Sequence, residues 1–206
     1  MEVNLVKHPL VEHSLSVLRA KTTGTAAFRQ HAGIVSTILV LEATRTLAVS
    51  SCEVETPLAR MQCGMLAGKT VVVPVLRAGL AMLFSAQDLL LDVSVGFLGL
   101  ERDEQTAVAR EYYQKFPEDL SDCRVLILDP MLATGGSLDD SVSAVKERGC
   151  REITLACVVA APEGIERIGE RHGDVTLFTA AIDESLDANK YIVPGLGDFG
   201  DRYFGT

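Results

Sequence analysis

The sequence predicts an α/β fold with a central, mainly parallel sheet flanked by helices. Short apolar runs rich in β-branched residues recur along the chain, they are continuously apolar, and segments of helical character separate most of them. Strands of a parallel sheet show this pattern because helices cover both faces of the sheet. Ligands of such sheets bind where strands end and loops begin. We therefore expect the chemistry at residues 75–80, 101–116, 129–137 and after 183.

The order of the elements follows from the periodicity of the apolar residues. Residues 9–50 are predicted to be helical, since apolar positions such as Ile34, Ile38 and Leu41 recur at steps of three and four. Strands are predicted at 70–75, 93–100, 124–129, 153–162 and 174–183, and helices at 80–91, 138–148 and 163–171. No linker or internal repeat divides the chain. Residues 1–206 are thus predicted to form one domain, with a helical N-terminal region (9–50), a core (70–183) and a C-terminal segment (184–206).

Composition limits the classes of partner. Apolar residues make up 48% of the chain and charged residues 23%, which excludes a disordered chain. The net charge of −9 argues against binding to a nucleic-acid polymer, which requires a basic face. A small phosphorylated ligand stays compatible with this charge, because a few arginines and backbone amides can hold it.

The spacing of cysteines and histidines and the hydropathy of the chain indicate whether disulfides, a zinc site or a membrane span are expected. The five cysteines form no C-x-x-C pair and the four histidines have no i, i+4 spacing, so neither a disulfide scaffold nor a structural zinc site is expected. The N-terminus has no apolar leader, and Gln87, Asp88 and Asp92 interrupt the most apolar window, residues 81–100. We predict a reduced, cytoplasmic protein without a membrane span.

Two glycine patterns imitate nucleotide-binding motifs. Residues 64–70, GMLAGKT, resemble a Walker A loop, but they have three residues between the glycines where four are needed, and they precede a strand. Residues 195–200, GLGDFG, match G-x-G-x-x-G but lie too close to the C-terminus for a following βαβ unit. The first is interpreted as a turn with a surface lysine, and a dinucleotide-dependent dehydrogenase is excluded.

The segment from Val125 to Leu138 is the strongest candidate for a ligand site. An apolar strand ends at Asp129, a short loop supplies the sequence Thr134-Gly-Gly-Ser137, and a helix follows. Glycines let several backbone N–H groups converge, and a helix N-terminus adds a partial positive charge, so the loop suits a phosphomonoester. From spacing alone, an ordinary βα turn with Ser137 as N-cap and Asp129 capping a loop is equally compatible.

Residues 129–137, DPMLATGGS, resemble the phosphoribosyl-diphosphate (PRPP) signature of the uracil phosphoribosyltransferases. Pro130 stands where most of the wider phosphoribosyltransferase class has a second acid, as is usual in the uracil branch. The similarity extends over nearly the whole chain. It includes residues 6–10 (VKHPL), 42–44 (EAT), 74–80 (PVLRAGL), 159–164 (VAAPEG) and 191–205 (YIVPGLGDFGDRYFG).

The resemblance implies a type I phosphoribosyltransferase fold with a flexible arm and a C-terminal hood that binds the base. It also implies an enzyme that transfers the phosphoribosyl group from PRPP to uracil, giving UMP and diphosphate. Arg77 lies in a tight glycine-containing turn after a strand, where a guanidinium suits a diphosphate; such loops in the class can hold a non-proline cis peptide. The residues predicted to bind PRPP are Arg77, Arg102, Asp129, Pro130, Met131, Leu132, Ala133, Thr134, Gly135, Gly136, Ser137 and Asp198, with Arg77, Arg102 and Asp129 as the catalytic set.

The arm and the hood take their expected roles from the same resemblance. Arg102, in the polar segment 101–117, is expected to reach the diphosphate, although Glu101 and Val108-Ala109 depart from the family pattern in this arm. The other charges of the arm, such as Glu104 and Glu111, are interpreted as a solvated hairpin. Uracil is expected to meet the hood at Ile192, Gly197, Asp198 and Phe199, mainly through backbone groups. The Phe199 side chain either stacks on the base or packs inside.

Mg²⁺ is the expected cofactor, bound chiefly through PRPP oxygens, with no metal site made by the protein alone. No histidine is placed to act as a general base. The apolar N-terminal region suggests a homodimer or a larger homo-oligomer, and the resemblance leaves open whether GTP acts as an effector. Two alternatives stay open as well: a phosphoribosyltransferase for another base, and a non-catalytic regulator that senses PRPP or a nucleotide.

Overall fold

A mainly parallel sheet forms the centre of the protein. The computed structural model describes the backbone of residues 1–102 and 109–206, and the side chains outside 100–111. Within these residues nine strands join one sheet, whose main path runs β1-β11-β10-β8-β4-β6-β7, with β5 beside β4 and β9 beside β10. β7 pairs antiparallel with β6, and the other pairs in this sheet are parallel. The strands are β1 (Glu2–Leu5), β4 (Lys69–Leu76), β5 (Ser94–Val95), β6 (Phe97–Arg102), β7 (Ala109–Lys115), β8 (Cys123–Leu128), β9 (Met131–Leu132), β10 (Glu152–Ala160) and β11 (Thr176–Ile182).

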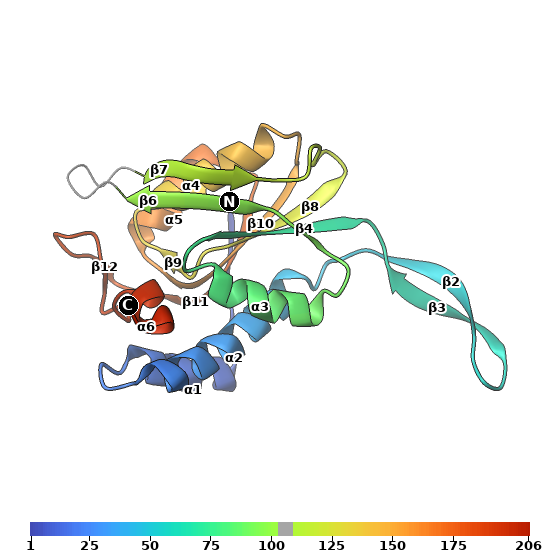
Figure 1. Ribbon diagram of the computed structural model, residues 1–206, viewed down its shortest axis with the longest axis horizontal. Coiled ribbons are helices and arrows are strands. Elements are labelled where there is room, and N and C mark those ends of the chain that lie inside the picture. The colour runs from blue at the N-terminus through green and yellow to red at the C-terminus, as the bar shows by residue number, and fades with distance from the viewer. Residues whose placement is uncertain (103–108) are drawn as a thin grey trace.

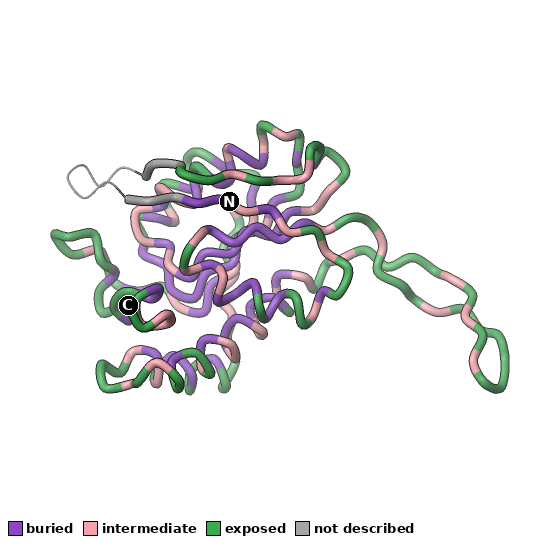
Figure 2. The backbone as a smooth tube through the Cα atoms, in the orientation of Figure 1, coloured by how far each residue is buried: buried purple, intermediate pink, exposed green. Residues whose placement is uncertain are grey.

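Helices cover both faces of this sheet, as the sequence predicts (Figure 1). α1 (Pro9–Arg19), α2 (Thr25–Ala43) and α3 (Leu80–Leu89) share one apolar core with Val72 and Leu126. α4 (Gly136–Lys146) and α5 (Pro162–Arg171) share a second core with Val71 and Val125. Successive strand residues point to opposite faces, so adjacent valines of β4 serve different cores. Continuous apolar runs are the result, and the buried positions accordingly follow the central strands in Figure 2.

The N-terminal region departs from the predicted helix over 9–50. α2 ends at Ala43, and β2 (Val49–Glu55) pairs antiparallel with β3 (Arg60–Leu66). This hairpin extends away from the sheet and helices (Figure 1). The first strand of the hairpin, VSSCEVE, is too polar to give a periodic signal of its own. The sequence pattern therefore does not show that the helical region ends at Ala43, before this strand begins. The short edge strand β1 also lies outside the predicted set, for the same reason.

β7 and β9 lie outside the predicted strands as well, and the predicted strand 93–100 is divided into β5 and β6. The other predicted strands and helices are confirmed with small shifts of their ends. The turn expected in residues 64–70 is confirmed, since β3 ends at Leu66 and β4 begins at Lys69 with no helix between them. The C-terminal segment adds β12 (Ser185–Leu186), β13 (Ile192–Val193) and α6 (Phe199–Phe204). Among the described residues, no helix is both long and apolar enough to cross a membrane.

A buried acid joins α4 to α5. Asp139 is 2% exposed, and its carboxylate lies 2.9 Å from a nitrogen of each of three cationic or titratable side chains, Arg167, Arg171 and His172. Burial alone would raise the pKa of Asp139, but the hydrogen bonds from Arg167 and His172 and the arginine charges outweigh it and lower that pKa. The negative charge of Asp139 is therefore a condition for packing α5 against α4.

We expect Asp139→Ala to lower the free energy of unfolding by about 2 kcal/mol, because it leaves the buried His172 ring nitrogen without its hydrogen-bond partner and removes the group that Arg167 and Arg171 share. Urea denaturation measures this change. Because the pKa of Asp139 is lowered in the folded state, its carboxylate stabilises the fold above the ordinary carboxyl pKa, and this stabilisation is lost as pH falls. The difference in the free energy of unfolding between wild type and Asp139→Ala should therefore shrink below about pH 4. The control is Asp174→Ala, which breaks an exposed pair with Lys146 at 2.5 Å and should cost less than about 1 kcal/mol. Equal losses from the two variants would contradict this account.

Candidate active site

One pocket of about 640 Å³ lies at the carboxyl ends of β4 and β8. Four segments far apart in sequence line it: the end of β4 with the turn that follows, Tyr112 of β7, the loop between β8 and α4, and the C-terminal hood. Each of the four places where the sequence predicts chemistry therefore contributes to the pocket. The lining residues are Val75, Leu76, Arg77, Ala78, Tyr112, Asp129, Met131, Leu132, Ala133, Thr134, Gly135, Gly136, Ser137, Leu138, Lys190, Tyr191, Ile192, Gly197, Asp198, Phe199 and Gly200.

The structure brings together most of the predicted site. All four predicted uracil-binding residues line the pocket, and so do most of the predicted PRPP-binding residues. Pro130 does not line it, although it belongs to the same loop. Arg102 ends β6, but its side chain falls outside the described part, as do residues 103–108 of the predicted arm.

The loop between β8 and α4 has the geometry of an anion cradle. Gly135 is the N-cap of α4 with φ +78°, and a Cβ there would lie 3.1 Å from the carbonyl oxygen of Gly164. Only glycine satisfies both conditions. The first N–H groups of α4 have no partner within the helix and are therefore available to an anion. Ser137 lies inside the first turn of α4, so its interpretation as the N-cap is wrong.

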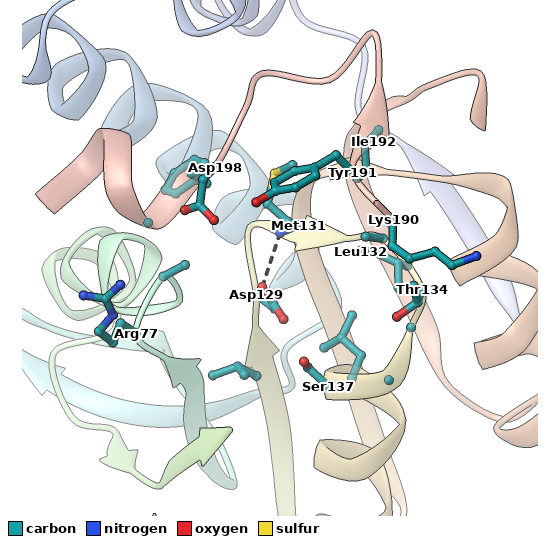
Figure 3. Close-up of a pocket in the computed structure, with 18 of the residues that line it drawn as sticks. Arg77, Asp129, Met131, Leu132, Thr134, Ser137, Lys190, Tyr191, Ile192 and Asp198 are labelled. Carbon is teal, nitrogen blue, oxygen red and sulfur yellow. Dashed lines mark hydrogen bonds between the residues drawn. The ribbon is translucent and has the colours of Figure 1, made fainter. Parts of the chain in front are cut away.

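Asp129 is a buried carboxyl group at the floor of the pocket. It is 9% exposed, and among the described residues the only hydrogen bond to its side chain comes from the Met131 N–H, at 3.3 Å (Figure 3). Burial raises the pKa of Asp129 to about 7, and the Met131 N–H only partly opposes this. A carboxylate kept with so few donors gains stabilisation from ligand hydroxyl groups that donate to it.

Arg77 stands on the opposite side of the pocket from the loop between β8 and α4 (Figure 3). The peptide bond from Leu76 to Arg77 is cis, the non-proline isomer that the family resemblance allows for this loop. The side chain is 60% exposed, and its Nη2 lies 3.4 Å from the carboxylate of Asp201, which is itself half-exposed. So long and exposed a contact leaves the guanidinium available to an anionic ligand.

The hood is held by an ion pair between a part-exposed arginine and a buried aspartate, which sequence reasoning did not find. Asp183 accepts hydrogen bonds from Arg19 Nη1 and Nη2 at 2.7 and 2.6 Å and from the Gly195 N–H at 2.8 Å, while Arg19 also donates to the Gly195 carbonyl at 2.7 Å. Gly195 has φ +58°, and a Cβ there would meet the Ile192 carbonyl at 2.1 Å. The position of Asp183 at the end of a predicted strand was the one available signal.

A second arginine fixes the far end of the hood. Arg202 donates to the carbonyl of Leu18, to that of Leu196 at 2.6 Å and to that of Ala20 at 2.7 Å. Asp198 caps α6 by accepting from the Asp201 N–H at 2.9 Å. The hood therefore presents its backbone to the pocket from a frame anchored on α1 and on the turn that follows it.

The Phe199 side chain packs inside the protein and does not face a base. It is 1% exposed and contacts Phe28 edge to face, with ring centroids 5.1 Å apart. The other two aromatic residues that line the pocket, Tyr112 of β7 and Tyr191 of the hood, are both half-exposed. Tyr191 and Lys190 are absent from the predicted site, because nothing in their spacing distinguishes them from other hood residues.

A parallel sheet with a glycine-rich anion loop after one strand and a hood above its carboxyl edge defines the class of the type I phosphoribosyltransferases. The adenine phosphoribosyl transferase of Trypanosoma brucei shares this fold, with a TM-score of 0.56 at 14% identity over 87% of this chain and 82% of that one. The family model described as uracil phosphoribosyltransferase matches residues 5–206. The chain belongs to the uracil phosphoribosyltransferase family.

Full-length relatives agree with this assignment. A uracil phosphoribosyltransferase of Clostridium perfringens (strain ATCC 13124) is 46% identical, and one of Clostridium botulinum (strain Hall) is 45% identical, each over all of this chain and 99% of the relative. The solved structure of the AQ2163 protein from Aquifex aeolicus matches with a TM-score of 0.94 at 35% identity, over 99% of this chain and 98% of that one.

The raised pKa of Asp129 gives a prediction that separates binding from stability. Between the ordinary carboxyl pKa and about 7, the folded state holds a proton that the unfolded state has lost, so wild-type stability should fall as pH rises through this range. Asp129→Asn should remove that fall and stabilise the ligand-free protein at pH 8 by roughly 2 kcal/mol. PRPP binding should weaken about tenfold, because an amide is a poorer acceptor than a carboxylate.

Denaturation at pH 5 and pH 8, with calorimetric titration of PRPP, measures both effects. Asp201→Asn is the matched control: its carboxylate is half-exposed, so the same substitution should leave the pH dependence of stability unchanged. Identical pH dependence in wild type and Asp129→Asn would contradict the assignment of Asp129 as the buried titrating group.

Proposed function

We propose that this chain transfers the 5-phosphoribosyl group of PRPP to uracil, giving UMP and diphosphate. The observation that carries the proposal is the single pocket shared by the anion cradle of α4, the exposed Arg77 and the backbone-lined hood. These three parts match the three parts of the reaction: a 5′-phosphate, a diphosphate and a planar base. The membership of the chain in its family supports the same reaction.

In the proposed reaction, N1 of uracil bonds to C1 of the ribose while the C1–oxygen bond to diphosphate breaks. The N1 proton leaves to solvent or to a diphosphate oxygen, and the bonding electrons leave with diphosphate. The first-turn amides of α4 and the hydroxyl groups of Thr134 and Ser137 hold the 5′-phosphate. Asp129 accepts from the ribose hydroxyls, and Arg77 stabilises the charge that grows on diphosphate. Catalysis then rests on alignment and charge stabilisation, and Arg102 completes the proposed diphosphate site.

The pocket also fits a magnesium ion carried in by PRPP. Asp129 and Asp198 are the carboxylates that line it, and the described residues contain no group of three or more metal-ligating side chains. One or two carboxylates beside substrate phosphates is a common setting for Mg²⁺, which keeps several of its waters. Bound there, Mg²⁺ would neutralise part of the diphosphate charge.

The hood is proposed to read the base through its backbone. Uracil presents an acceptor, a donor and an acceptor at O2, N3–H and O4. Ile192, Gly197 and Phe199, which line the pocket, are proposed to offer backbone groups to the base, and Asp198 is proposed to face PRPP. The burial of the Phe199 ring supports this role, because it leaves only the backbone of that residue to face the ligand.

We further propose that two copies associate through the β2–β3 hairpin, not through the N-terminal helices that suggested a dimer from sequence. Leu41 is the one large apolar side chain that α2 exposes, whereas the hairpin exposes five. These are Val49, Leu58, Met61, Met65 and Leu66. A protruding hairpin with several exposed apolar side chains buries them by docking on a second copy of the chain.

We also propose a cytoplasmic location for the protein and GTP as an effector of the enzyme. Measuring UMP formation with and without GTP tests the proposed effector.

Base choice provides the test of the proposed activity. Cytosine exchanges the N3–H donor for an acceptor and the O4 acceptor for a donor, and backbone groups cannot rotate to match it. Two mismatches of a few kcal/mol each predict a ratio of kcat/KM for uracil over cytosine on the order of 10⁴. UMP and CMP formation is measured at saturating PRPP, with adenine and hypoxanthine as further bases. Cytosine used within tenfold of uracil would contradict backbone reading, and no turnover with any base would favour a regulator.

The proposed dimer is tested by placing charged side chains on the β2–β3 hairpin. We expect the double variant Met61→Glu, Met65→Glu to sediment as a monomer at concentrations where wild type is a dimer, because a dimer interface would have to bury the new carboxylates. Glu53→Gln, on the opposite face of the hairpin, is the control and should stay dimeric. A double variant that remains dimeric would remove the hairpin from the interface.

A further inference from the structure

Lys190 has a backbone conformation that side chains rarely adopt. Its φ is 67°, and it is the one non-glycine residue of the described chain with a positive φ. Hydrogen bonds to Asp187 fix this turn between β12 and β13: the N–H groups of Asn189 and Tyr191 both donate to its carboxylate at 2.8 Å. The Lys190 N–H donates to the Asp187 carbonyl at 3.0 Å. The conformation is therefore held by the turn, and glycine would adopt it at lower cost.

The turn places the Lys190 side chain at the phosphate half of the pocket. Lys190 lines the pocket, and Figure 3 shows it on the same side as Thr134, across the pocket from Arg77. The residue is exposed, and no ion pair involving its ammonium group is found in the described part of the chain. A flexible lysine beside an anion cradle can reach an anion bound there.

The donors that line the cradle are neutral groups: the first-turn amides of α4 and the hydroxyls of Thr134 and Ser137. Arg167 lies behind the cradle glycines, but its Nε and Nη2 donate to the Asp139 carboxylate at 3.2 and 2.9 Å, so its charge is already paired. Among the described lining residues the cationic side chains are Arg77 and Lys190, and they stand on opposite sides. A 5′-phosphate monoester carries up to two negative charges, so a lysine above the cradle supplies the missing counter-charge.

We propose that Lys190 binds the 5′-phosphate of PRPP and of the nucleotide product, while Arg77 faces the diphosphate end. This inference rests on the proposed function, and it adds a specificity residue from the hood to the phosphate site. It also gives the ligand a direction in the pocket. The turn built on Asp187 thereby places a hood residue beside the phosphate site.

The test compares UMP with uridine, which lacks the phosphate, by calorimetric titration. Lys190→Gly is the main variant, because glycine accepts φ 67° and the turn should persist. We expect its Kd for UMP to rise about tenfold, as for loss of one charge-assisted contact, while its Kd for uridine stays within twofold of wild type. Lys190→Arg keeps the charge and should restore most of the UMP affinity. Lys69→Ala removes a lysine at the start of β4, the end opposite the pocket, and should change neither value.

The outcomes separate this inference from the function on which it rests. If wild type binds UMP and Lys190→Gly binds it equally well, the Lys190 inference fails and the proposed function stands. Equal losses of UMP and uridine affinity would assign Lys190 a structural role and would also overturn the inference. If wild type neither binds UMP nor forms it, the proposed function fails and the inference fails with it.

Discussion

The pocket depends on the ion pair between Asp183 and Arg19. Asp183 directly follows β11, is 8% exposed, and accepts two hydrogen bonds from the Arg19 guanidinium and one from the Gly195 N–H. A bidentate pair of this kind fixes geometry as well as charge. It ties α1 and the sheet to the hood, beside the apolar contacts that Ile192, Leu196 and Phe199 make with the core. Backbone groups can recognise a base only from a fixed position, and this pair provides it.

Three buried aspartates have different roles, and the partners of each carboxylate determine its role. Asp139 and Asp183 have arginine partners and act as structural anchors for α5 and for the hood. Asp129 has no such partner in the described chain, and burial raises its pKa to about 7. An acid left without a cation is poorly satisfied until a ligand arrives. Asp139 and Asp183 thus stabilise the fold, whereas Asp129 is left to accept hydrogen bonds from a ligand.

Patterns that a strand or a loop imposes on its own residues could be predicted from the sequence, whereas long-range pairs could not. The strand ending at Asp129 and the Thr134–Ser137 loop show buried apolar residues followed by glycines, and both were found. The β2–β3 hairpin was missed because its strands bury little and carry no apolar period. The Arg19–Asp183 pair spans most of the chain, and the φ of Lys190 depends on hydrogen bonds to Asp187, so neither leaves a local signature.

A double-mutant cycle on Arg19 and Asp183, read in steady-state kinetics, tests most directly whether this pair positions the base half of the pocket. If it does, Arg19→Met and Asp183→Asn should each raise KM for uracil about tenfold or more and leave the affinity for PRPP unchanged. KM of the double variant for uracil should then be little higher than that of the single variant with the higher KM. Additive losses, or a loss of PRPP affinity in place of uracil affinity, would contradict the account.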